Sequence, residues 1–188
     1  MMRTCTAGTS GSSRRASSNT YRPRSNVDNI EEMTAKLRRM DDEFGGGAVL
    51  DLVKSQVRFV LDLLRDHQYT TSVGMRLHGA ASELLRLAGW LSFDSGQHAQ
   101  AQRFWVAALH GAHSAGDRAL GSNILGFMSC QAKDLELYAE AVNLAEAARQ
   151  GYPGRSPRVT AILDLRVAEA HAQTSDTAQT RAAIDTAY

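Results

Sequence analysis

The stretch ASELLRLAGWLSFDSGQHAQAQRFWVAALHGA, residues 81–112, decides the fold. It consists of two helical runs joined by a turn signal at Ser95-Gly96. Small residues stand where larger ones would keep two helices apart: Gly89 in the first run, and Ala101 and Ala108, 12 and 19 residues later, in the second. This spacing predicts an antiparallel helix hairpin whose two backbones approach closely.

The same pattern of residues recurs further along the chain. Leu85, Ala101 and Ala108 correspond, at an offset of 40, to Leu125, Ala141 and Ala148, and the last of these corresponds to Ala187 at an offset of 39. The spacing is typical of tetratricopeptide (TPR) repeats, although both offsets exceed the consensus period of about 34 residues. A hairpin of this kind has an apolar flank that only a neighbouring hairpin can bury. We therefore predict an all-α, right-handed TPR-like superhelix of about three to four helix pairs.

Capping residues and glycines predict the helix boundaries. A first helix should begin after Val27, with Asp28 as its N-cap and Glu31 as the capping-box partner, and should stop at Gly45–Gly47. Ser156-Pro157 is typical of an N-cap followed by the first helical residue. Residues 71–93 form either one long helix or two with a kink at a glycine. Further helices are expected over residues 50–67, 98–114, 118–135, 138–148, 158–174 and 177–188.

The first 27 residues differ in composition from the rest. They carry five arginines and no acidic residue, whereas residues 28–188 carry 16 basic and 20 acidic side chains. Because they contain almost no aliphatic residues, we predict a disordered basic tail, 1–27, before a helical domain, 28–188. The tail is either solvated or an arm for DNA phosphates, and its Arg- and Ser-rich composition also resembles a transit peptide.

Neither a membrane protein nor a disulfide-stabilised protein is expected. The longest apolar runs are too short to cross a bilayer. Cys5 lies in the tail and Cys130 follows a helical apolar run, so a structural disulfide between them is not expected. These features favour a reduced, cytoplasmic protein.

Motifs for catalysis are missing from the sequence. It contains neither a GxxxxGK[ST] phosphate loop nor a GxSxG nucleophile elbow. His110 and His113 are three residues apart, but no nearby carboxylate or thiol completes a metal-ligand set. Cys130 is either a reactive thiol or a small buried apolar residue. We predict no enzymatic activity, no metal and no cofactor.

A concave surface is the expected binding site. If the hairpins stack, the first helix of each pair presents Glu83, Arg86, Trp90, Asn123, Lys133, Glu169 and Gln173 to it. Amides and charges of both signs suit an extended peptide, whose backbone needs donors and acceptors. The alternative is that these are solvated face residues. Trp90 either contacts a ligand or packs in the core, whereas Trp105 occupies the large aromatic position and should be buried.

Three segments resemble one protein family: RRMDDEFGGGAVL (Arg38–Leu50), ELLRLAGWLSFDSGQHAQAQRFWVAALHGAHSAGDRALGSNILGFMSCQAKDL (Glu83–Leu135) and GYPGRSPRVTAIL (Gly151–Leu163). They are similar to actinobacterial, Streptomyces-type transcriptional regulators, in which a helix-turn-helix domain precedes a TPR-like region for sensing or protein association. Residues 1–27 lack the length and apolar periodicity of a helix-turn-helix. The resemblance therefore implies the TPR-like region alone, and no direct DNA binding is expected from this chain.

The expected function is the regulatory or sensor region of a transcriptional regulator that binds a partner protein or peptide. The alternative is a stand-alone TPR adaptor or homodimerisation module that uses its last helix pair.

Overall fold

The chain folds as an array of α-helices. The computed structural model describes residues 23–44, 46–66, 68–174 and 177–187, and these form helices without any strand. The helices are α1 (Pro23–Phe44), α2 (Gly46–Asp66), α3 (Thr71–Asp94), α4 (His98–Ala115), α5 (Arg118–Asp134), α6 (Tyr138–Gly151), α7 (Pro157–Gln173) and α8 (Thr177–Ala187). The predicted all-α fold is confirmed.

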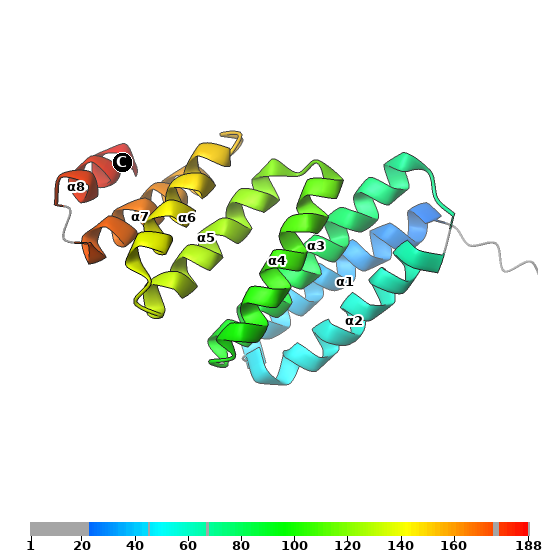
Figure 1. Cartoon of the computed structure of the whole chain (residues 1–188). Helices are drawn as coiled ribbons and strands as arrows, with labels where there is room; N and C mark the ends of the chain where they lie inside the picture. Colours follow the sequence, from blue (N-terminus) through cyan, green and yellow to red (C-terminus); the bar gives the residue numbers. More distant parts are fainter. Residues whose placement is uncertain (1–22, 45, 67, 175–176, 188) are drawn as a thin grey trace, which may run out of the picture.

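Consecutive helices form antiparallel pairs that pack side by side (Figure 1). The first helices of the pairs are neighbours: α3 contacts both α1 and α5, and α5 contacts α7. The second helix of each pair also contacts the first helix of the next pair. Each pair thus buries the flank of the one before it, which is the packing of a helical repeat array.

The α3–α4 seam is as close as the small residues predict. Ala101, Trp105 and Ala108 are fully buried. A Cβ atom at Gly89 would lie 2.3 Å from Nε1 of Trp105, so no other residue leaves room for this indole. Trp105 Nε1 donates a hydrogen bond to the Arg86 carbonyl at 3.2 Å, which satisfies its buried N–H group.

In the α5–α6 pair, the buried residues of α6 are all alanines. Ala141, Ala145 and Ala148 are fully buried. The Ser129 hydroxyl donates a hydrogen bond to the Ala141 carbonyl at 2.8 Å, across the seam. Cys130 is also buried, which is the second of the two interpretations drawn from the sequence.

Capping follows the sequence in three later helices. Ser156 caps α7 and Pro157 is its first residue, as predicted. Gly96 and Gly116 take left-handed backbone conformations, with φ of 71° and 69°, after α3 and α4. After α5 the same conformation falls on Glu136, with φ of 61°, although a side chain makes it unfavourable there.

The predicted start of the first helix is wrong. α1 begins at Pro23 and Val27 is fully buried, so residues 23–27 belong to the helical domain and not to the tail. Asp28 consequently lies inside the helix and does not cap it; its carboxylate instead pairs with Arg76 of α3. Residues 1–22, for which we predict disorder, lie outside the described residues.

Two glycine predictions have different outcomes. The predicted stop of the first helix is confirmed, because α1 ends at Phe44, directly before the glycine run; Gly46 and Gly47 lie in the first turn of α2, and Gly45 is outside the described residues. Residues 71–94 form one helix and not two. Gly74 makes room in it for the ring of Tyr69, which would lie 2.7 Å from a Cβ at that position.

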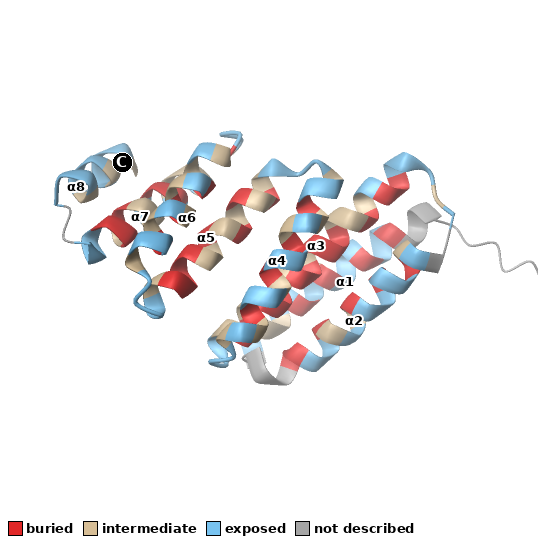
Figure 2. Cartoon of the chain, in the orientation of Figure 1, coloured by how far each residue is buried: buried red, intermediate tan, exposed pale blue. Residues whose placement is uncertain are grey.

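The core follows the faces where helices meet and thins toward the last helix (Figure 2). Its largest cluster joins α1 to α5 around α3. α8 has no buried residue, and Ala187, predicted to match the seam position of Ala148, is only half-buried.

Candidate binding groove

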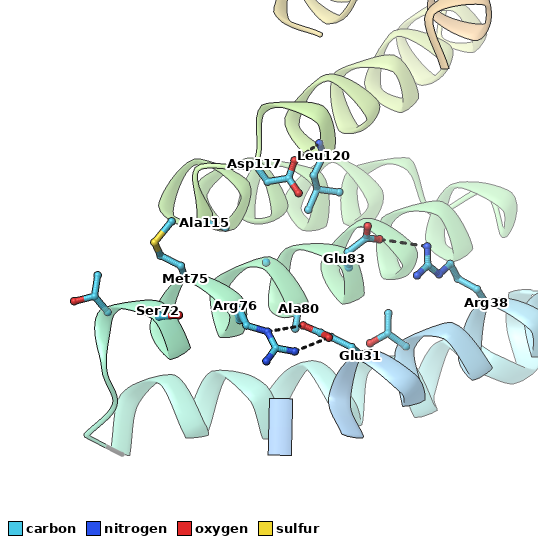
Figure 3. A pocket seen from close by; sticks show the side chains of 13 residues that line it. Glu31, Arg38, Ser72, Met75, Arg76, Ala80, Glu83, Ala115, Asp117 and Leu120 are labelled. Carbon is cyan, nitrogen blue, oxygen red and sulfur yellow. Dashed lines mark hydrogen bonds and ion pairs between the residues drawn. The ribbon is translucent and has the colours of Figure 1, made fainter. Parts of the chain in front are cut away.

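An open groove of about 810 Å³ lies along the face shared by α1 and α3 (Figure 3). The end of α4 and the start of α5 close one side of it. We call it the α1–α3 groove; it is lined by Glu31, Thr34, Arg38, Thr71, Ser72, Met75, Arg76, Gly79, Ala80, Glu83, Ala115, Asp117 and Leu120. Its volume is in the range of pockets that hold small molecules or short peptide segments.

Arg76 joins α1 to α3 at the edge of this groove. Its Nη2 donates hydrogen bonds to Asp28 at 2.7 Å and to Glu31 at 2.8 Å, and its Nε donates a third, to Glu31, at 3.3 Å. The hydrogen bonds from the guanidinium to Glu31 and then Asp28 raise the pKa of Arg76 above its usual value. Arg76 therefore has its hydrogen-bonding capacity largely occupied within the protein.

Glu83 lies between two arginines. Arg86 donates to one oxygen of Glu83 at 2.9 and 3.1 Å, and Nη1 of Arg38 lies 3.7 Å from that same oxygen. The first pair is within hydrogen-bond distance and the second is not. The groove thus carries charges of both signs.

The seven predicted site residues do not lie in one place. Of the seven, only Glu83 lines the α1–α3 groove. Asn123 is half-buried in α5 and Gln173 is exposed in the last turn of α7. The other four, Arg86, Trp90, Lys133 and Glu169, make contacts with other side chains of the array.

Arg86 and Trp90 belong to an aromatic cluster between α3 and α5. The Arg86 guanidinium lies 5.5 Å from the centre of the Phe127 ring, and its side chain is only 11% exposed. The Trp90 ring centre is 5.4 Å from that of Phe127 and 5.8 Å from that of Phe93. Trp90 is half-buried, so of the two alternatives left by the sequence, packing accounts for most of its surface.

Lys133 and Glu169 form an ion pair that joins α5 to α7. The hydrogen bond to Glu169 raises the pKa of Lys133 above its usual value. Burial raises the pKa of the nearby Cys130 thiol, and the charges of Lys133 and Glu169 have smaller effects on it. A buried thiol with a raised pKa is a poor nucleophile, so a reactive cysteine is not indicated here.

Sequence reasoning missed the contribution of α1. Arg38 and Glu31 line the groove from α1, yet the prediction placed site residues only on the later helices. The signal was present: Asp28, Glu31 and Arg38 are at i, i+3 and i+10, one polar face beside the apolar stripe of the same helix. Asp28 and Glu31 also match a capping box, which is the role that the sequence predicts for them.

A second polar cluster lies where α6 and α7 meet. Arg149 pairs with the buried Asp164, and Nε2 of His171 lies 3.1 Å from Glu146. Both pairs line a cavity of about 310 Å³ that α8 covers on one side. One oxygen of Asp164 is buried and has no hydrogen-bond partner.

The described residues contain neither a membrane-spanning helix nor a cluster of metal ligands. None of the helices in the described ranges has the length and apolar character that crossing a membrane requires. Within the same ranges, no group of three histidine, cysteine or acidic side chains gathers as a metal-ligand set.

Comparison with known proteins identifies no relative of this chain. No family model, no curated protein and no solved structure matches the chain.

Proposed function

We propose that this protein is the partner-binding, regulatory region of a transcriptional regulator, and that it binds an extended peptide or protein segment in the α1–α3 groove. The observation that carries the proposal is the groove itself, about 810 Å³ of open space with charges of both signs on its walls. An extended segment presents backbone donors and acceptors that such walls can pair.

The regulatory role rests on the resemblance of Arg38–Leu50, Glu83–Leu135 and Gly151–Leu163 to Streptomyces-type regulators. We further propose a TPR-like, right-handed superhelical path for the array and a cytoplasmic location. Direct DNA binding, catalysis, metals and cofactors are not part of the proposal.

Gly79→Leu provides the sharpest test of peptide binding. Gly79 lines the groove, and a Cβ there would meet only the Ala115 Cβ, at the ordinary distance of 3.7 Å. The leucine would therefore occupy the groove while the backbone keeps its conformation. We expect peptides selected from an unbiased displayed library to bind the full chain and to lose at least about tenfold in affinity to the variant, or about 1.4 kcal/mol.

Gly121→Leu is the matched control. Gly121 lies in α5 away from this groove, and a Cβ there would meet nothing within 4 Å. Equal binding by Gly79→Leu and the native chain would place the peptide elsewhere, and a library without any binder would end the proposal. For the regulatory role, chromatin immunoprecipitation of the tagged chain from its own cells should enrich promoters, and this enrichment should fall in Gly79→Leu.

The alternative function, an adaptor or homodimerisation module, has one observation in its favour. The last helix pair exposes three large aliphatic side chains, Ile162, Leu165 and Ile184. A homodimer in sedimentation that is lost on removal of residues 177–188 would support it. A monomer at all concentrations would leave peptide binding as the proposal.

A further inference from the structure

The two arginines of the α1–α3 groove are in different states. Arg76 donates three hydrogen bonds to carboxylates of α1. Arg38 lies 3.7 Å from its partner Glu83, and its side chain is 45% exposed. A guanidinium forms its strongest interactions with a carboxylate in a close, bidentate geometry, which Glu83 does not provide to Arg38.

Glu83 does not depend on Arg38. Its hydrogen bonds at 2.9 and 3.1 Å come from Arg86, whose side chain is 11% exposed and lies over Phe127. If Arg38 turned toward another carboxylate, Glu83 would keep its closer partner. An incoming anion therefore gains a cation without leaving a charge of the protein unpaired.

Toward the opposite end of the groove, Met75 offers an apolar side chain beside the hydroxyl residues Thr71 and Ser72. Figure 3 shows Met75 and Ser72 toward one end and Arg38 toward the other, with Ala80 between them. Met75 is 45% exposed, and its Cε lies close to Gly116, where a Cβ would be 3.7 Å away. Methionine is a flexible side chain that adapts to the shape of an apolar partner.

The spacing of these ends sets the length of a ligand. Met75 and Glu83, the neighbour of Arg38, are eight residues apart on α3. At 1.5 Å per residue the ends are about 12 Å apart along the helix. An extended chain covers this distance in three or four residues, at about 3.3 Å each.

From these observations we propose that the α1–α3 groove selects an extended segment in which an aliphatic side chain and an acidic side chain are three or four positions apart. The carboxylate pairs with Arg38, and the aliphatic group packs on Met75. This inference rests on the proposed function, since it defines the partner of the same groove.

A set of short peptides tests the acidic position. Fluorescein-labelled, C-terminally amidated Gly/Ser hexapeptides would carry one leucine and one glutamate, three or four positions apart in either order, or glutamine or lysine in place of the glutamate. We expect the full chain to bind a glutamate peptide at least about tenfold more tightly than its glutamine partner in anisotropy titrations. That preference should shrink with rising salt, because the pair is partly exposed.

Arg38→Gln and Arg76→Gln separate recognition from folding. Arg38→Gln should abolish the preference for glutamate over glutamine and leave the thermal midpoint nearly unchanged. Arg76→Gln should lower the midpoint but keep the preference. A further pair of peptides, with leucine or with serine in its place, tests the aliphatic position. Met75→Ser should remove the difference in affinity between the two, and a double-mutant cycle measures this coupling directly.

The outcomes distinguish this inference from the proposed function. Peptides that bind in the groove without any preference for glutamate, or a preference that survives in Arg38→Gln, would overturn the inference alone. A groove that binds no peptide from the unbiased library would overturn both.

Discussion

The helix pairs α3–α4 and α5–α6 have buried alanines at equivalent positions but differ in the side chain between these alanines. Positions 40 residues apart correspond, and Ala101 and Ala108 have their equivalents in Ala141 and Ala148, all four fully buried. At the centre of the seam, however, Trp105 is replaced by Ala145. The two pairs thus share their buried alanines, while the side chain between these alanines differs greatly in volume.

The two seams differ at the position that holds Gly89 in one and Ser129 in the other. In α3–α4, Gly89 makes room for the Trp105 indole, whose N–H reaches the Arg86 carbonyl. In α5–α6, the position equivalent to Gly89 is Ser129, whose hydroxyl reaches the Ala141 carbonyl. An antiparallel helix pair therefore forms both where a large indole packs against a glycine and where a serine packs against alanines.

Trp105→Ala is the change with the largest expected effect. It removes the largest fully buried side chain, so we expect a loss of about 3–5 kcal/mol in the free energy of unfolding. Urea denaturation followed by circular dichroism measures it. Val106→Ala on the same helix, where the side chain is 43% exposed, should change stability far less. Similar losses in both variants would show that the indole is not the centre of the seam.

Ala101→Leu and Ala141→Leu compare the two seams directly. Both alanines are fully buried, so we expect overpacking to cost about 1–3 kcal/mol at each. The cost should be larger at Ala101, because the neighbouring Trp105 already fills its seam. Thermal melts of the two variants check the order. An unchanged midpoint for Ala101→Leu would contradict the close approach of α3 and α4.

In the equivalent turns after α3 and α5, the residue with a left-handed backbone is Gly96 in the first and Glu136 in the second. The two turns share their hydrogen bonds: Gln97 N–H to Ser92 O at 2.7 Å in one, and Leu137 N–H to Ala132 O at 2.8 Å in the other. Glu136 takes a conformation that glycine adopts without strain. We expect Glu136→Gly to stabilise the protein by about 1 kcal/mol and Gly96→Ala to destabilise it by about as much. Chemical denaturation of both variants checks these opposite signs.

The smallest expected effect concerns the ion pairs between first helices. Lys133 has a raised pKa in the folded protein, so its contribution is complete below the unfolded pKa of about 10.4 and is lost as the pH rises through the folded pKa. We expect the Lys133 pair to contribute less than about 1 kcal/mol, since it is partly exposed.

Melts between pH 9 and about 11.5 measure this loss, and Lys133→Met should make the midpoint less sensitive to pH over that range. Arg76→Gln is the control, because arginine remains charged throughout. An identical pH response with and without Lys133 would show that the pair between α5 and α7 contributes nothing.

Local patterns in the sequence predicted what depends on local chemistry. The buried alanines, the core position of Trp105 and the Ser156-Pro157 helix start all follow from spacing or capping. Asp28 shows the limit of this reasoning. With Glu31 three residues later it matches a capping box, but its partner Arg76 is 48 residues away. A contact between distant helices leaves no trace in a local motif.

The candidate site was predicted only in part, for the same reason. Of the predicted residues Glu83 lines the groove, but Arg38 and Glu31 of α1, which line it too, were not predicted. Arg86 and Trp90 have the composition of a binding face. Their contacts with Phe127 of the next pair draw both of them into packing, and pairwise spacing within α3 does not reveal that neighbour.

The lack of any buried residue in α8 has a consequence for how the array opens. Among the described helices α8 packs on α7 alone and has no buried residue, so its detachment exposes little apolar surface. Backbone amides of α8 should therefore exchange with deuterated solvent first, those of α7 and α6 later, and those of α3 only on global unfolding. A peptide held between α1 and α3 would slow exchange around α3 and leave the fraying end as it is.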